Sequence, residues 1–165
     1  DYPAKSGVRR VHTVADEDVL PVIERLKARR GGLPELLAFR DGRHWVDVRS
    51  TDINDYIRER SRHECSAKDF RTWNATVLAA ASLAASPAGR GKAARERVIR
   101  EVVKDVAAQL GNTPAVCRSS YIDPRVFDRY RSGATITPKL AEIVENGHDD
   151  RARRRVERAV VELLG

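Results

Sequence analysis

The sequence repeats one short signal for the start of an α-helix, a capping residue followed directly by proline. The signal occurs at Thr113-Pro114, Asp123-Pro124 and Thr137-Pro138. The capping side chain accepts hydrogen bonds from the free N–H groups of the first turn, and proline at the first helical position has no N–H to lose. Starts that follow one another so closely restrict this part of the chain to short helices.

The remaining segments predict a mainly α-helical chain. We expect a short helix that begins at Pro114 and carries Tyr121. Further helices are expected at residues 16–30, 52–62, 66–86, 93–110, 124–131, 138–145 and 151–164. In the second of these helices we expect Ile53, Tyr56 and Ile57 to point inward. Small side chains fill the alanine-rich part of residues 77–85, which favours the close approach of a neighbouring helix.

A small antiparallel β element is predicted on the N-terminal side. Residues 1–14 suggest two short strands joined at Ser6-Gly7, with Lys5 at the tip of the hairpin. Residues 36–48 suggest a second hairpin that turns at Asp41-Gly42, a strong two-residue turn signal.

Composition limits the class of protein. A chain of 165 residues is long enough for one compact domain, and its formal charge of +7 favours a polyanionic partner, although many ordinary basic proteins share this balance. Cys65 and Cys117 form neither a metal motif nor a disulfide framework, which favours a reducing cytoplasm. No apolar run reaches the length of a membrane span. Methionine is absent, so we expect the chain to be a fragment or a processed product.

A cationic pair opens the helix that begins after Ser66. Ser66 and Asp69 have the spacing of a capping box, and Lys68 and Arg71 lie three positions apart in the first turns. Cations at this end oppose the helix dipole, so local stability does not explain them, whereas a bound phosphate does.

Three segments together resemble the catalytic domain of type IB DNA topoisomerases, and most closely the small poxvirus-like enzymes of bacteria. They are Lys68-Asp69-Phe70-Arg71-Thr72-Trp73, then Leu110-Gly111-Asn112-Thr113-Pro114, then Ser120-Tyr121. Pro3-Ala4-Lys5-Ser6-Gly7 resembles the turn that carries the catalytic lysine of that family. The resemblance implies the catalytic fold that these topoisomerases share with tyrosine recombinases.

The resemblance also implies a transesterification at a DNA phosphodiester. Tyr121 is the expected nucleophile, and its 3′-phosphotyrosyl intermediate conserves the bond energy, so no ATP is needed. Arg71 and Asn112 are expected to donate hydrogen bonds to the non-bridging oxygens of the transition state. Lys5 would protonate the departing 5′ oxygen.

The DNA-contacting residues that we expect are Lys68, Thr113 and Arg118. The expected partner is double-stranded DNA, with no membrane, no cofactor and no metal, and the expected state is a monomer in the cytoplasm, associated with the nucleoid. Residues 1–165 are interpreted as one catalytic domain whose upstream part and N-terminal clamp domain are missing.

Two departures from the family pattern are visible. Many members carry histidine where this chain has Asn112, although bacterial members resemble it in having asparagine. The family also uses an arginine upstream of the lysine hairpin, and this chain starts too late to contain it. Arg9 and Arg10 follow the turn and are not assigned that role.

Two other functions remain open. A tyrosine recombinase shares the fold and the tyrosine, arginine and lysine roles, but usually has histidine three residues before the arginine, where this chain has Lys68. A non-catalytic DNA-binding module would also explain the basic charge and the helical content, and in it Tyr121 would be incidental.

Overall fold

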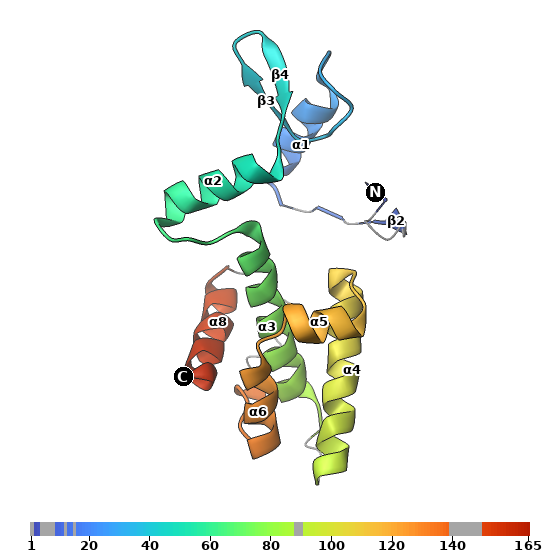
Figure 1. Ribbon diagram of the computed structural model, residues 1–165, viewed down its shortest axis with the longest axis vertical. Coiled ribbons are helices and arrows are strands. Elements are labelled where there is room, and N and C mark those ends of the chain that lie inside the picture. The colour runs from blue at the N-terminus through green and yellow to red at the C-terminus, as the bar shows by residue number, and fades with distance from the viewer. Residues whose placement is uncertain (1, 4–8, 12, 15, 88–90, 139–149) are drawn as a thin grey trace. The chain divides into compact units, whose positions relative to one another are not determined.

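The computed structural model describes residues 2–3, 9–11, 13–14, 16–87, 91–138 and 150–165. The chain divides into two compact units, Asp1–Arg60 and Ser61–Gly165, and each is described by itself. Figure 1 shows the strands in the first unit and a bundle of helices in the second. The prediction of a mainly helical chain with a small antiparallel β element is confirmed.

The first unit contains two antiparallel hairpins. Strands β1 (Tyr2–Pro3) and β2 (Arg9–Arg10) pair as expected, and the connecting turn with Lys5 lies outside the described residues. Strands β3 (Ala38–Asp41) and β4 (His44–Asp47) form the second hairpin. Its turn lies at Gly42-Arg43, one residue later than predicted, because Asp41 pairs with His44 and the positive φ of 57° falls on Gly42.

Two helices complete the first unit. Helix α1 (Leu20–Lys27) is shorter than the predicted 16–30, because the Asp16 carboxylate accepts hydrogen bonds from the N–H groups of Asp18 and Val19 and holds that stretch in a turn. Helix α2 (Ser50–Ser61) begins two residues earlier than predicted. The sequence predicts that Ile53, Tyr56 and Ile57 point inward. This prediction is wrong for Ile53 and Tyr56, which are 38% and 59% exposed, and Ile57 is only half-buried, so that α2 buries no residue.

Trp45 organises the packing of the first unit. The guanidinium groups of Arg29 and Arg40 lie 5.8 and 5.6 Å from the centre of its ring. Arg29 also donates hydrogen bonds to the carbonyl oxygens of Leu33 and Leu36. Among the described residues of this unit only Ala38 is a buried hydrophobic side chain, so stacking and hydrogen bonds replace much of an apolar core.

Helix α3 (Ala67–Ala85) lies at the centre of the second unit. The predicted capping box is present, with the Ser66 N–H donating to the Asp69 carboxylate at 2.8 Å. Figure 1 shows α8 (Asp150–Leu164) on one side of α3 and α4 (Lys92–Leu110) on the other, and both contact it. Its alanine-rich half is buried, which leaves room for these neighbours to approach closely.

Two shorter helices follow α4 and close the bundle. They are α5 (Pro114–Ser120) and α6 (Pro124–Ser132), and both begin at the predicted capping residue and proline. Helices α4, α6 and α8 agree with the predicted ranges to within one residue at each end. The predicted helix at 138–145 lies almost wholly outside the described residues.

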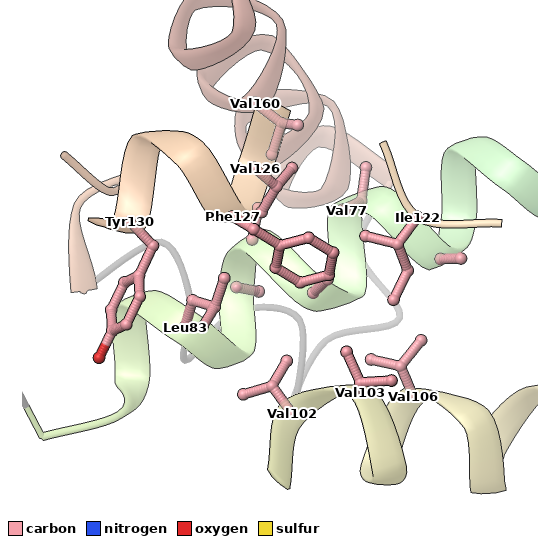
Figure 2. Close-up of a cluster of buried hydrophobic side chains, with 14 of the residues drawn as sticks. Val77, Leu83, Val102, Val103, Val106, Ile122, Val126, Phe127, Tyr130 and Val160 are labelled. Atoms are coloured by element: carbon pink, nitrogen blue, oxygen red, sulfur yellow. The ribbon is translucent and has the colours of Figure 1, made fainter. Parts of the chain in front are cut away.

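Within the described residues, the core of the second unit consists mostly of aliphatic side chains, together with Cys117 of α5 and two aromatic rings of α6. Figure 2 shows Phe127 of α6 among these side chains. The largest fully buried side chains of the described residues are Leu83, Ile99, Val106, Val126, Val156, Val160, Thr76 and Cys117. A search of the described residues found no helix with the length and hydropathy of a membrane span.

Neighbouring valines of α8 offer a test of this core. Val160 is fully buried and Val161 is 57% exposed. Val160→Ala should lower the free energy of unfolding by about 2 kcal/mol, because methyl groups are removed and a small cavity remains. Val161→Ala should change it by less than about 0.5 kcal/mol. Urea unfolding followed by circular dichroism measures both, and equal losses would contradict the described packing of α8.

Candidate active site

Asn112 is placed by the end of helix α4. Gly111 adopts the left-handed conformation with φ 71°, its N–H donates to the Ala108 carbonyl at 3.2 Å, and the Asn112 N–H donates to the Ala107 carbonyl at 2.9 Å. This pair of hydrogen bonds terminates the helix in the manner that glycine favours. The side-chain nitrogen Nδ2 of Asn112 is buried and has no hydrogen-bond partner.

Tyr121 is placed by helix α5. The Thr113 hydroxyl accepts a hydrogen bond from the Val116 N–H at 3.3 Å, and Pro114 occupies the first turn, as the sequence predicts. The prediction that this helix carries Tyr121 needs a correction: Tyr121 caps its C-terminal end, with φ −128° and ψ −22°. Its N–H still donates to the Cys117 carbonyl, so the helix end fixes the start of the link to α6.

Arg71 joins these two segments from the second turn of α3. Its Nη2 atom donates a hydrogen bond to the carbonyl oxygen of Leu110, two residues before Asn112. The same guanidinium lies 5.2 Å from the centre of the Tyr121 ring. The structure therefore brings Arg71 together with Tyr121 and with the segment that carries Asn112, although their positions in the sequence are far apart.

Two buried donors at this place lack an acceptor. The Nε atom of Arg71 and the Nδ2 atom of Asn112 are both buried without a hydrogen-bond partner. A buried polar group left without a partner costs about 1–3 kcal/mol, and more when it is charged. Both nitrogen atoms can only donate, so the group that would satisfy them is an acceptor, and beside a guanidinium an anionic acceptor is favoured.

The other predicted site residues differ in how the structure places them. Lys68 is exposed on α3, one turn before Arg71, and Thr113 is the exposed cap of α5. Arg118 is exposed on α5, with its guanidinium 5.0 Å from the centre of the Phe127 ring. Lys5 lies outside the described residues and in the other unit, so its place relative to these side chains is not described.

Sequence analysis missed Thr76, a buried polar residue of α3 that is only 2% exposed. Its hydroxyl donates to the Thr72 carbonyl at 2.9 Å and accepts a hydrogen bond from the Asp123 N–H at 3.1 Å. The same oxygen lies 3.5 Å from the Tyr121 carbonyl oxygen. The signal in the sequence was a hydroxyl at the start of a long apolar stretch, facing the core.

The charges near the site are partly neutralised by local pairs. A hydrogen bond from Arg125 is the largest cause that lowers the pKa of Asp123, the residue that caps α6. Burial raises the pKa of the Cys117 thiol, against the opposing charge of Arg71. No cluster of histidine, cysteine and carboxylate side chains suited to a metal ion occurs within the residues that the structure describes.

Comparison of the chain with known proteins identifies one family. The family model described as "Eukaryotic DNA topoisomerase I, catalytic core" matches residues 1–160. The chain belongs to this family. It is also 26% identical over 156 residues to the DNA topoisomerase 1B of Acanthamoeba polyphaga mimivirus, a match that covers 91% of this chain and 45% of the viral protein. The chain thus spans about half the length of this topoisomerase.

The pKa of Asp123 leads to a prediction about acid stability. The pKa of Asp123 is lower in the folded state than in the unfolded state, so the ionised carboxylate stabilises the fold. This stabilisation is fully present above the unfolded-state pKa of about 3.9 and is lost as the pH falls through the folded-state pKa. Asp123→Asn keeps a side chain that can cap α6 but removes this contribution.

The difference in melting temperature between the wild type and Asp123→Asn should therefore be positive at pH 7 and shrink towards zero below pH 4, by differential scanning calorimetry. Asp105→Asn on the exposed face of α4 is the matched control. A difference that stays constant with pH would rule out the ion pair between Asp123 and Arg125 as its source.

Proposed function

We propose that this chain is the catalytic part of a type IB DNA topoisomerase. It relaxes supercoiled double-stranded DNA by transient cleavage of one strand and religation, without ATP. The observation that carries the proposal is the position of Arg71, whose guanidinium lies beside Tyr121 with its Nε buried and unpaired. The match to a topoisomerase family over nearly the whole chain supports topoisomerase over recombinase.

In the proposed reaction the Tyr121 hydroxyl oxygen attacks the phosphorus of a DNA phosphodiester. The bond from phosphorus to the 5′ oxygen breaks, and a 3′-phosphotyrosyl bond forms in its place. The number of phosphoester bonds is unchanged, so the reverse attack by the 5′ hydroxyl restores the strand without an energy source. The phenolic proton of Tyr121 leaves to solvent, and we assign the proton that the 5′ oxygen takes up to Lys5.

Arg71 and Asn112 stabilise the charge that develops on the non-bridging oxygens in this reaction. Arg71 offers the N–H groups that its bond to the Leu110 carbonyl does not use, and Asn112 offers its amide nitrogen. Donors that are already in place and out of water are worth more to a transition state than donors that must be ordered first. Lys68, Thr113 and Arg118 are assigned to phosphates beside the cleavage site.

Arg118 is suited to binding a phosphate because its guanidinium is held against an aromatic ring. Its guanidinium rests on the buried Phe127 ring, so part of its freedom is already lost before DNA binds. The protein as a whole is proposed to act as a monomer, on the DNA of the nucleoid in the cytoplasm.

Covalent trapping tests the proposed reaction directly. The full-length protein, incubated with a duplex whose cleaved end diffuses away, should form an adduct that resists denaturation and maps to Tyr121. Tyr121→Phe should form none while it binds DNA with nearly unchanged affinity, because only the nucleophilic oxygen is lost.

The matched control is Tyr130→Phe, since the Tyr130 hydroxyl is buried on α6, away from the site, without a hydrogen-bond partner. That variant should keep its adduct. An adduct in Tyr121→Phe would exclude Tyr121 as the nucleophile, and none in the wild type would favour a non-catalytic DNA-binding module. Relaxation of a plasmid in EDTA without ATP tests the rest of the proposal.

Arg71 gives a second test of the site. Arg71→Ala should slow single-turnover cleavage by about 100- to 1,000-fold, by analogy with the loss of one donor to a transition-state oxygen. Arg71→Lys should recover little of this rate, because an ammonium does not reproduce the planar fork of donors. Arg97→Ala, on the exposed face of α4, controls for the loss of one positive charge. Rates close to the wild type in both Arg71 variants would remove Arg71 from the reaction.

A further inference from the structure

Thr76 provides a polar contact between the core of the second unit and the segment that carries Tyr121. It lies on α3 between Ala75 and Val77, which are both buried, and is itself only 2% exposed. A buried hydroxyl is costly unless its hydrogen bonds are made, and a valine would fill the same volume without that cost. The hydroxyl therefore needs an explanation beyond packing.

The hydroxyl of Thr76 serves the link between α5 and α6. It accepts the Asp123 N–H at 3.1 Å and donates to the Thr72 carbonyl at 2.9 Å. The Tyr121 carbonyl oxygen lies 3.5 Å away, within reach of the same hydrogen if it turns. Thr76 thus contacts the backbone on both sides of Ile122, whose side chain is buried in the core shown in Figure 2.

Tyr121 needs the backbone contact with Thr76 because it lies beyond the last regular turn of α5. It is the C-terminal cap of α5, and a cap residue at a helix end is easily displaced. Arg71 contacts its ring, and Thr76, about 7.5 Å further along the same helix, contacts its backbone. One rigid helix therefore fixes both the side chain and the main chain of Tyr121.

We propose that Thr76 is a positioning residue that holds Tyr121 at a set distance from Arg71. The inference rests on the proposed function, in which the Tyr121 oxygen must meet a phosphorus atom in line. Positioning of this kind is valuable because a displacement of about 1 Å in a reacting group can cost on the order of 100-fold in rate. Because Thr76 is only 2% exposed, we assign it no contact with DNA, and its role acts through Tyr121.

Three variants separate positioning from general stability. Thr76→Val keeps the shape of the side chain but leaves the Asp123 N–H without its acceptor, and Thr76→Ser keeps the hydroxyl. Ser86→Ala is the matched control, because the Ser86 hydroxyl also donates to a carbonyl four residues earlier on α3, that of Ser82 at 2.7 Å, away from Tyr121.

Two measurements on the full-length protein are made well below its melting temperature. In single-turnover cleavage of the trapping duplex, Thr76→Val should be slower by about 10- to 100-fold at unchanged DNA affinity, while Thr76→Ser restores most of the rate and Ser86→Ala loses none. Fluorine NMR of 3-fluorotyrosine protein, with the Tyr121 signal assigned by its loss in Tyr121→Phe, should show that signal shifted or broadened in Thr76→Val alone.

The outcomes are distinct. A Tyr121 signal that is the same in Thr76→Val and in the wild type overturns the proposal, and so does a variant that is less stable but cleaves at the wild-type rate. A signal that moves in Thr76→Val, in a protein whose wild type forms no adduct, supports the anchor and overturns the proposed cleavage reaction instead.

Discussion

The contact of Arg71 with the end of α4 and with the Tyr121 ring is the interaction on which the site depends. It is possible only because α3 runs through the middle of the second unit, where its buried alanines let other helices come close. A bulkier helix would push α4 and α5 outward, and a guanidinium that reaches Leu110 and Tyr121 at once would no longer do so. The small side chains of α3 thus allow the Arg71 guanidinium to contact both Leu110 and Tyr121.

This arrangement costs stability in the absence of a ligand. The buried Nε of Arg71 and the buried amide nitrogen of Asn112 lack acceptors, and such groups reduce stability until a ligand satisfies them. Other charged groups of the bundle are paired, such as Glu96 with Arg131 at 2.6 Å, which ties α4 to α6. The hydrogen bond from Arg131 is the largest cause that lowers the pKa of Glu96, with the charge of Arg118 contributing less. The site thus holds unpaired hydrogen-bond donors while nearby charged groups are paired, which is the arrangement that an anion-binding site requires.

Much of the fold was predictable because local rules determine it. The capping box at Ser66 and the capped prolines at Pro114 and Pro124 fix helix starts through interactions within a few residues, and the structure confirms each of them. The inward direction of Ile53 and Tyr56 was wrong, because periodicity in a sequence shows an apolar face but does not show what covers it. Similarly, Asp16 looks like the start of a helix, but its carboxylate forms a turn instead.

The candidate site was only partly predictable, for a related reason. Residue types with a clear chemical preference, such as Arg71 and Tyr121, stand out in the sequence, and the structure brings these two together. Thr76 did not stand out, because its importance lies in a bond to the Asp123 N–H that spans a large separation in the chain. Lys5 stays a prediction, since it lies outside the described residues.

Asparagine at position 112 has a further consequence for the chemistry. An amide donates a hydrogen bond but carries no charge, and an arginine guanidinium offers only hydrogen-bond donors. The stabilisation proposed for these two donors therefore rests on hydrogen bonds to an anion, and neither donor has to exchange a proton during the reaction. Any pH dependence of the proposed cleavage must then come from groups that gain or lose protons during the reaction, the nucleophile and the acid that protonates the leaving oxygen. The proposed reaction thus divides its two tasks between different residues: charge stabilisation is assigned to Arg71 and Asn112, and proton transfer is assigned to other groups.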